Sequence, residues 1–293
     1  MNIPIPGTTR LGLNDKLPLS CSRGGICCHG KTVGLNPWEL ARLAKANGLT
    51  PGIFRDRYCM SGGIRLRFDQ TTGWDGLTEC SQYVPDSGCS IHECRPLVCR
   101  LYPLGRLQCG NDIHYIHLGN SFPCLEKCPE VLDLPYMSVG EYLDGQNVKA
   151  YEVAQDKYLE LMQRLADNAF VLLFETGLAV SGDKLTLRFW RELGKIDPEH
   201  MSAKIGQRWI DLLMIPDIEG CLDDPSAFAN RHIEILDTQA QESFGNLNDF
   251  DSIRAASSLM MSLALHLGRG LGVDPTELAQ HWILTAKKLG ARH

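Results

Sequence analysis

The sequence lacks an apolar stretch long enough to cross a lipid bilayer, because its longest charge-free apolar run lies between Arg254 and Arg269. It also has no basic segment followed by an apolar stretch after Met1, so no secretory signal peptide is indicated. The sequence also has no excess of cationic residues, because its formal net charge is −6. A negative net charge argues against a general nucleic-acid binder. We therefore expect a cytoplasmic protein that binds neither membrane nor nucleic acid.

Internal repeats and low-complexity linkers are also absent from the sequence. With 293 residues, of which 44% are hydrophobic, the chain can bury an ordinary core in one or two domains. The excess of acidic residues falls after residue 140, whereas the first 140 residues are close to neutral. The two parts of the chain therefore differ in electrostatic character.

The first 140 residues have an irregular pattern of short elements. Asn36, Pro37 and Glu39 form a capping box with proline at the first helical position, which predicts a helix start. The other elements predicted here are a helix over 51–58, a strand over 64–68, and a hairpin over 104–117 that turns at 109–112. Such a region has little core of its own.

From about residue 141 the pattern becomes helical. Apolar residues recur at three- and four-residue steps and form one stripe: Tyr151, Ala154, Tyr158, Leu161, Leu165, Ala169 and Leu172. Further helix starts are predicted where aspartate precedes proline, at Asp197, Asp224 and Asp274. The segment from Ile253 to Leu267 is apolar nearly all round, which favours a central helix. We expect an α+β, mostly helical protein, with an irregular cysteine-rich domain over 1–140 and an all-helical bundle over 141–293.

Cysteine is concentrated in the first of these domains, where eleven of the twelve cysteines lie between Cys21 and Cys128. Thiolates at this density repel one another and oxidise readily, and a metal centre stabilises them by taking up their negative charge. A disulfide framework is the weaker interpretation in a reducing cytosol, and the adjacent Cys27 and Cys28 fit it poorly. The sequence therefore predicts that 1–140 is a metal-cluster domain and that Cys221 is an ordinary thiol.

The spacing of the cysteines favours an iron–sulfur centre over structural zinc. The chain has Cys-x5-Cys-Cys, then Cys-x8-Cys-x4-Cys-x4-Cys, then Cys-x3-Cys, whereas zinc fingers combine two closely spaced pairs. Iron–sulfur clusters also take four thiolates but accept looser spacing. We predict one or two [4Fe-4S] clusters, with zinc as the alternative. The candidate ligands are Cys21, Cys27, Cys28, Cys80, Cys89, Cys94, Cys99, Cys124 and Cys128.

Two arginines lie within the densest group of cysteines. Arg95 and Arg100 follow Cys94 and Cys99 directly. Guanidinium groups carry permanent charge and several donors, so both are predicted to hydrogen-bond cluster sulfurs and raise the reduction potential. The alternative is a structural salt bridge within the segment.

Two segments carry a resemblance to a known family. Residues 21–28 are Cys-Ser-Arg-Gly-Gly-Ile-Cys-Cys, and residues 89–103 are Cys-Ser-Ile-His-Glu-Cys-Arg-Pro-Leu-Val-Cys-Arg-Leu-Tyr-Pro. Over roughly 18–130 the chain resembles the YkgJ-type cysteine-cluster family, a zinc- or iron-chelating domain that starts with Cys-x2-Cys-x2-Cys-Cys. Gly24 replaces the second cysteine of that motif, and Cys94 is an addition to the family pattern. The matching positions are Cys21, Cys27, Cys28, Cys80, Cys89, Ile91, Arg95, Pro96, Cys99, Arg100, Tyr102 and Pro103.

The resemblance and the thiol density together indicate six metal ligands, which are Cys21, Cys27, Cys28, Cys80, Cys89 and Cys99. Six thiols exceed the four that one cube needs. We therefore predict that Cys94, with one or both of Cys124 and Cys128, completes this centre or forms a second one. The alternative is that Cys94 is simply buried and that the other two flank a loop.

The resemblance implies chelation but no reaction, so three functions stay open. The first is an iron–sulfur protein in redox chemistry or electron transfer. The second is an iron–sulfur-dependent enzyme that transfers methyl groups to a protein substrate, as the similar cysteine cluster of the flagellin lysine N-methylase family implies. The third is a structural zinc module that binds a protein partner.

Overall fold

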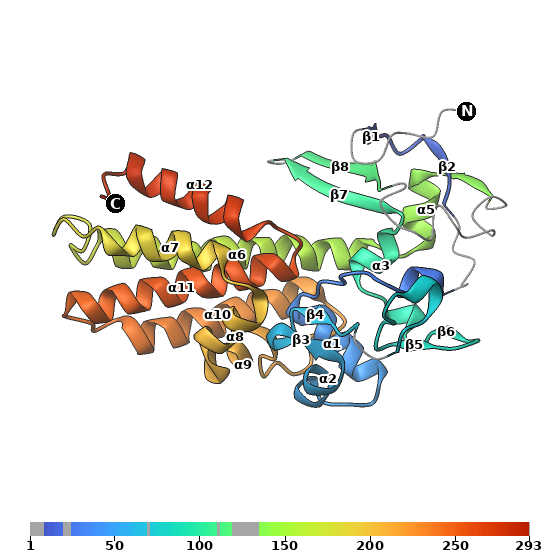
Figure 1. Cartoon of the computed structure of the whole chain (residues 1–293), viewed down its shortest axis with the longest axis horizontal. Coiled ribbons are helices and arrows are strands. Elements are labelled where there is room, and N and C mark those ends of the chain that lie inside the picture. The colour runs from blue at the N-terminus through green and yellow to red at the C-terminus, as the bar shows by residue number, and fades with distance from the viewer. Residues whose placement is uncertain (1–8, 20–24, 69–70, 110–111, 119–134, 293) are drawn as a thin grey trace. The chain divides into compact units, whose positions relative to one another are not determined.

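The computed structural model describes residues 9–19, 25–68, 71–109, 112–118 and 135–292. It is mostly helical with small antiparallel sheets, which confirms the expected α+β class (Figure 1). The chain forms two compact units, one of Met1–Val33 with Leu66–Glu152 and one of Gly34–Arg65 with Val153–His293. The units are interleaved in sequence, whereas the change of sequence pattern suggested a single boundary near residue 140.

The first unit, which we call the cysteine unit, holds most of the short elements. Its three-stranded sheet has the order β1-β8-β7, and two further sheets pair β2 with β9 and β5 with β6. The elements are β1 (Arg10–Leu11), β2 (Lys16–Pro18), η1 (Ile26–Cys28), η3 (Trp74–Gly76), β5 (Tyr83–Val84), β6 (Gly88–Cys89), η4 (His92–Cys94), α3 (Leu97–Leu101), β7 (Leu104–Cys109), β8 (Asp112–His117), β9 (Tyr136–Ser138) and α5 (Val139–Gly145).

The second unit, which we call the helical unit, contains the long helices and most of α6 (Lys149–Phe174). Its other elements are α1 (Pro37–Ala46), α2 (Pro51–Tyr58), β3 (Cys59–Met60), η2 (Ser61–Gly63), α7 (Leu185–Lys195), α8 (Pro198–Ile205), α9 (Gln207–Met214), α10 (Pro225–Phe244), α11 (Phe250–Gly270) and α12 (Pro275–Lys288). The first residue of β4 (Arg65–Leu66) belongs to the helical unit and the second to the cysteine unit. None of the described helices combines the length and apolar character that a bilayer crossing requires.

The predicted helix starts are confirmed, because each depends on a local hydrogen bond. The Glu39 amide donates to Asn36 Oδ1 at 2.9 Å, and the Asn36 amide donates to Glu39 Oε2 at 3.1 Å, which completes the capping box of α1. The carboxylates of Asp197, Asp224 and Asp274 accept backbone amides at the starts of α8, α10 and α12. The helices α1, α8, α10 and α12 therefore begin at the predicted positions.

The predicted apolar stripe of α6 is buried from Tyr151 to Leu172. In α11 the segment from Met260 to Gly270 is buried at every position, so this helix is central as expected. It ends at Gly270, and Gly272 has a φ of 82° while the Val273 amide donates to the Gly268 carbonyl at 2.8 Å. The chain therefore stops being helical at Gly270 and turns at Gly272.

The predicted hairpin is confirmed in its register, which pairs Leu104 with His117 and Cys109 with Asp112. The predicted strand over 64–68 is shorter than expected and consists of β4 alone. The backbone partner of this segment changes along its length. The Leu66 amide donates to the Val33 carbonyl, whereas the Arg67 carbonyl accepts the Ser81 amide. Residues 64–68 therefore do not pair continuously with one neighbouring strand.

Gly34 is predicted to be intolerant of a side chain. A Cβ built there would lie 2.2 Å from the Gly270 carbonyl oxygen, a rigid backbone atom at the end of α11. Because neither backbone can move freely, we expect Gly34→Ala to lower the free energy of unfolding by about 2 kcal/mol. Chemical denaturation measures this, with Gly52→Ala as control because its Cβ would approach nothing closer than 3.8 Å. Equal stability of the two variants would contradict the prediction.

Candidate metal centre

Cys27 and Cys28 are positioned by a tight turn. Gly25, with a φ of 74°, precedes η1, and its carbonyl accepts the Cys28 amide at 2.8 Å. A Cβ at Gly25 would lie 2.5 Å from the ring of Tyr83, so glycine is required both for its conformation and for space. The turn fixes two adjacent thiols at the edge of the cysteine unit's main cavity.

Cys80 and Cys89 are tied to this turn by backbone pairing. The Cys80 amide donates to the Cys28 carbonyl at 2.8 Å, and the Cys80 carbonyl accepts the Tyr83 amide at 2.9 Å. Tyr83 in turn pairs with Cys89 in the β5–β6 hairpin. Three cysteines that are far apart in the sequence are therefore connected through a short chain of backbone hydrogen bonds.

Cys99 comes from α3, a short helix that follows Pro96. The amides of Cys99 and Arg100 both donate to the Pro96 carbonyl at 3.0 Å. The residue before the helix has a φ of −60°, the value that a proline ring imposes. The Arg-Pro-Leu-Val-Cys segment thus places Cys99 on the same cavity as the other thiols.

The cavity has a volume of about 120 Å³ and lies entirely within the cysteine unit. Apolar side chains make up much of its wall, and Lys31 and Arg95 supply positive charge. The Lys31 ammonium lies 3.1 Å from the centre of the Tyr102 ring. Neither aspartate nor glutamate lines the cavity among the described residues. Its thiols are those of Cys27, Cys28, Cys80, Cys89 and Cys99.

The five thiols differ in acidity. A hydrogen bond with Cys28 lowers the pKa of Cys27 to about 6, and nearby Lys31 and Arg95 act in the same direction. A hydrogen bond with Cys28 also lowers the pKa of Cys89 to about 7. The pKa of Cys28 itself is raised by these two hydrogen bonds, and burial raises the pKa of Cys80 to about 12.

Burial likewise raises the pKa of Cys99 above its usual range. Two of the thiols are therefore readily ionised, while three release their protons only when a cation takes up the thiolate charge. Such a donor set suits a centre bound by several thiolates, because soft sulfur ligands select zinc or iron–sulfur clusters. In the described part of the chain, no three His, Cys, Asp or Glu side chains are arranged to hold a metal ion. The predicted ligand Cys21 lies outside that part.

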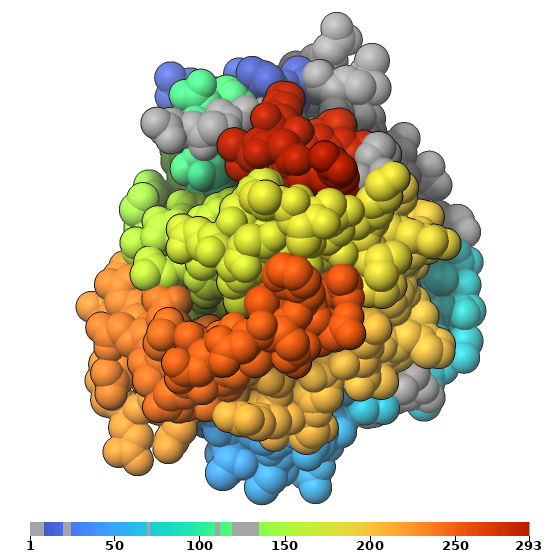
Figure 2. Space-filling view, turned by 90° about the vertical axis from the view of Figure 1, so that its left-hand side faces the viewer, coloured from blue at the N-terminus to red at the C-terminus, as the bar shows by residue number. Residues whose placement is uncertain are grey.

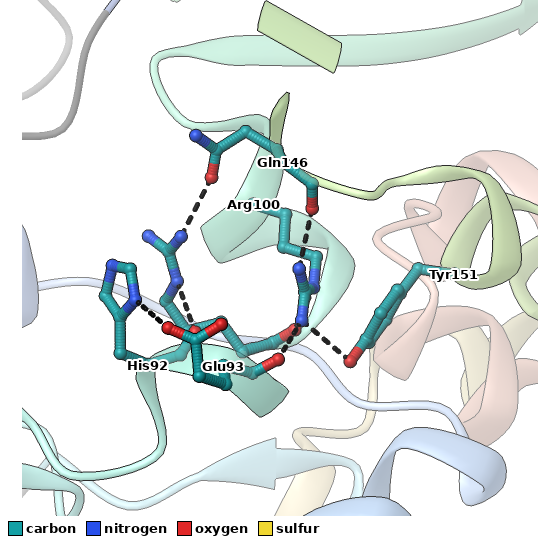
Figure 3. A network of polar contacts seen from close by, with 6 residues as sticks. His92, Glu93, Arg100, Gln146 and Tyr151 are labelled. Carbon is teal, nitrogen blue, oxygen red and sulfur yellow. Dashed lines mark hydrogen bonds and ion pairs between the residues drawn. The ribbon is translucent and has the colours of Figure 1, made fainter. Parts of the chain in front are cut away.

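Arg95 and Arg100 form a polar network beside the cavity (Figure 3). Arg95 Nε donates to the His92 carbonyl at 2.9 Å, and Arg95 Nη2 donates to Gln146 Oε1 at 2.8 Å. Arg95 also lines the cavity, and its charge acts on the thiols of Cys27 and Cys89. Its guanidinium thus connects the thiol cavity to the end of α5.

Arg100 has a different environment. Its guanidinium donates to the carbonyls of Arg95 at 2.8 Å and Gln146 at 2.6 Å, to the Glu93 carbonyl, and to the Tyr151 hydroxyl at 2.9 Å. The guanidinium carbon lies 4.1 Å from the centre of the Tyr151 ring. Arg100 does not line the cavity. Its contacts hold the backbone of the cysteine-rich segment, and they include neither a thiol nor a carboxylate.

The remaining candidate ligands are not part of the described cavity. Cys94 is half-buried in η4 and does not line it. Cys21, Cys124 and Cys128 lie outside the described residues, so the predicted second centre stays a prediction. Cys59 is buried in the helical unit.

Several residues of the site had no signal in the sequence for the role that they have there. Gln146 and Tyr151 complete the arginine network, and Val33, Leu66 and Phe68 supply apolar wall to the cavity. None of them belongs to a cysteine motif or to a local pattern that predicts such a contact. Contacts between such distant residues are indicated only by pairs of positions that change together in an alignment of related chains.

A family model described as a putative zinc- or iron-chelating domain, with the name CxxCxxCC, matches residues 20–116. The match covers all the described cysteines of the cavity and supports metal binding by this part of the chain. No curated protein and no solved structure matches the chain.

Proposed function

We propose that the cysteine unit binds an iron–sulfur cluster and that the protein takes part in redox chemistry or electron transfer. The observation that carries the proposal is the presence of five thiols on one cavity, from Cys27, Cys28, Cys80, Cys89 and Cys99. Together with Cys21 these residues would hold the group. A cytoplasmic location and a protein partner are part of the same proposal.

The spacing of the cysteines favours an iron–sulfur cluster over zinc, because zinc sites combine two closely spaced pairs whereas iron–sulfur clusters accept looser spacing. A structural zinc site is closed by four ligands. Five thiols already line the described cavity, and Cys21 belongs to the same sequence motif. One zinc ion and one cube each use only four thiolates, so the additional thiols favour a second centre over unused thiols, which invite mixed disulfides.

The surrounding residues suit a redox centre. An iron–sulfur cluster supplies reversible electron transfer, with a potential set by charge, hydrogen bonds and exposure to solvent. Val33, Leu66 and Phe68 line the cavity with apolar side chains. Lys31 and Arg95 place positive charge next to the thiols, which favours the more negative, reduced state and raises the potential.

Metal analysis of protein purified without oxygen tests the proposal. We expect a brown protein with about four iron and four acid-labile sulfide ions per chain for one cluster, or about eight of each for two. If two clusters are present, Cys94→Ala and Cys124→Ala should lower the iron content. Stoichiometric zinc without sulfide would contradict the proposal and support a structural zinc module.

A further inference from the structure

The two outer helices α7 and α12 of the helical unit run antiparallel. Near the end of α7, a Cβ at Gly194 would lie 2.9 Å from the Cβ of Ala279 in the first half of α12. Before the start of α7, a Cβ at Gly182 would lie 3.6 Å from Arg292 Nη1, just beyond α12. The start of α7 and the end of α12 therefore lie together, and Figure 2 shows the red end of α12 against the yellow segment that leads into α7.

Apolar side chains are unusually exposed at this end of the helix pair. Val180, in the turn before α7, is 88% exposed, and Leu289, just after α12, is 62% exposed. Leu185, Phe189 and Leu284 are each more than 40% exposed. Leu185 and Phe189 are four residues apart and so lie on one side of α7. Scattered single exposures are ordinary, but five on adjoining elements form a patch.

Positive charge surrounds the patch. Lys184, Arg188, Lys288 and Arg292 are all exposed, and none of them forms a hydrogen bond or ion pair with a described residue. Two acidic groups of the same elements are paired with other cations. Asp183 binds Arg254 at 3.0 Å and is buried, and Glu192 binds Lys195 at 2.9 Å. We call these four cations and five apolar side chains the α7–α12 face.

In place of the sequence-based expectation that the protein binds no membrane, we propose that the α7–α12 face docks it on an anionic phospholipid surface. Cations that flank protruding apolar side chains are the arrangement of proteins that lie on a membrane, where the side chains enter the boundary between headgroups and acyl chains. The charge of the face is opposite to that of the chain as a whole, whose formal net charge is −6. The cations are thus concentrated where an anionic surface would meet them.

The shape of the face favours a lipid surface over an acidic protein segment. The most exposed apolar residue, Val180, lies in a turn, and Leu289 lies at a helix end, so the patch is built of projecting side chains. A partner helix binds in a groove. Two cavities of the described helical unit, one lined by α6, α10 and α11 and the other by residues 217–234, include no residue of the α7–α12 face.

Sedimentation with lipid vesicles tests the proposal on the full-length, metal-loaded protein. We expect binding to vesicles of equimolar phosphatidylcholine and phosphatidylglycerol, and none to vesicles of phosphatidylcholine alone. Lys184→Glu and Lys288→Glu should each weaken binding by about fivefold, since each removes a cation from the anionic surface. Val180→Asp should weaken it without changing the circular dichroism spectrum, because the side chain is exposed.

Lys204→Glu is the matched control, because Lys204 is an exposed lysine on α8 outside the face. It should bind vesicles like the unaltered protein. Absence of binding to the anionic vesicles, or equal binding by the Lys288→Glu and Lys204→Glu variants, would overturn the proposal. Binding to polyglutamate in place of vesicles would also overturn it and would indicate an acidic protein partner.

Discussion

Replacement of Cys28 by alanine is expected to abolish metal binding by the cysteine unit. The Cys28 thiol is hydrogen-bonded to both Cys27 and Cys89, and its carbonyl accepts the amide of Cys80. Cys28 is therefore the central member of the described thiol group. Loss of a residue that only hydrogen-bonds a metal ligand lowers the affinity for the metal by about 10- to 100-fold. Loss of a direct ligand should therefore lower this affinity further.

The Cys28→Ala variant should also unfold at a lower temperature, because the affinity for metal is part of the folding free energy of a small cysteine-rich unit. Metal content by mass spectrometry and thermal unfolding followed by circular dichroism measure the two effects. Cys99→Ala should behave in the same way, whereas Cys221→Ala, in the helical unit, should retain its metal. Full metal occupancy in both Cys28→Ala and Cys99→Ala would disprove the ligand assignment.

Features set by neighbouring residues could be predicted from the sequence. The starts of α1, α8, α10 and α12 depend on a side chain and an amide two or three residues away, so a short pattern specifies them. The stripe of α6 follows from helical periodicity. The grouping of the thiols was predicted from their density and from the family resemblance, and five of them do share a cavity.

Features that depend on distant parts of the chain could not be predicted in this way. The segment Gly34–Arg65 belongs to the helical unit, and its contacts with α11 include the close approach of Gly34 to Gly270 and the hydrogen bond between the Ser61 carbonyl and His266. A pattern of local propensities has no information on such a contact. For the same reason the sequence motif predicted one shared role for Arg95 and Arg100 and did not indicate that their hydrogen-bond partners differ.

The difference between these two arginines leads to a second large effect. Arg100 is 6% exposed, and its guanidinium donates to three carbonyl oxygens and to the hydroxyl of Tyr151. Glutamine is shorter and has only one amide group to donate, so Arg100→Gln leaves most of these acceptors, which are buried or partly buried, without their donor. Because a buried acceptor without a partner costs about 1–3 kcal/mol, we expect a loss of about 3 kcal/mol in the free energy of unfolding for the acceptors together.

Arg95→Gln is the matched control for this prediction, since Arg95 lines the thiol cavity and has fewer carbonyl partners. It should lower the reduction potential of the bound centre, because a positive charge next to the thiolates is lost, and should reduce stability less than Arg100→Gln does. Chemical denaturation and anaerobic redox titration of both variants separate the two roles. A lowered potential without loss of stability in Arg100→Gln would show that Arg100 acts on the centre itself, since a residue that only holds the backbone of the Arg-Pro segment changes stability first.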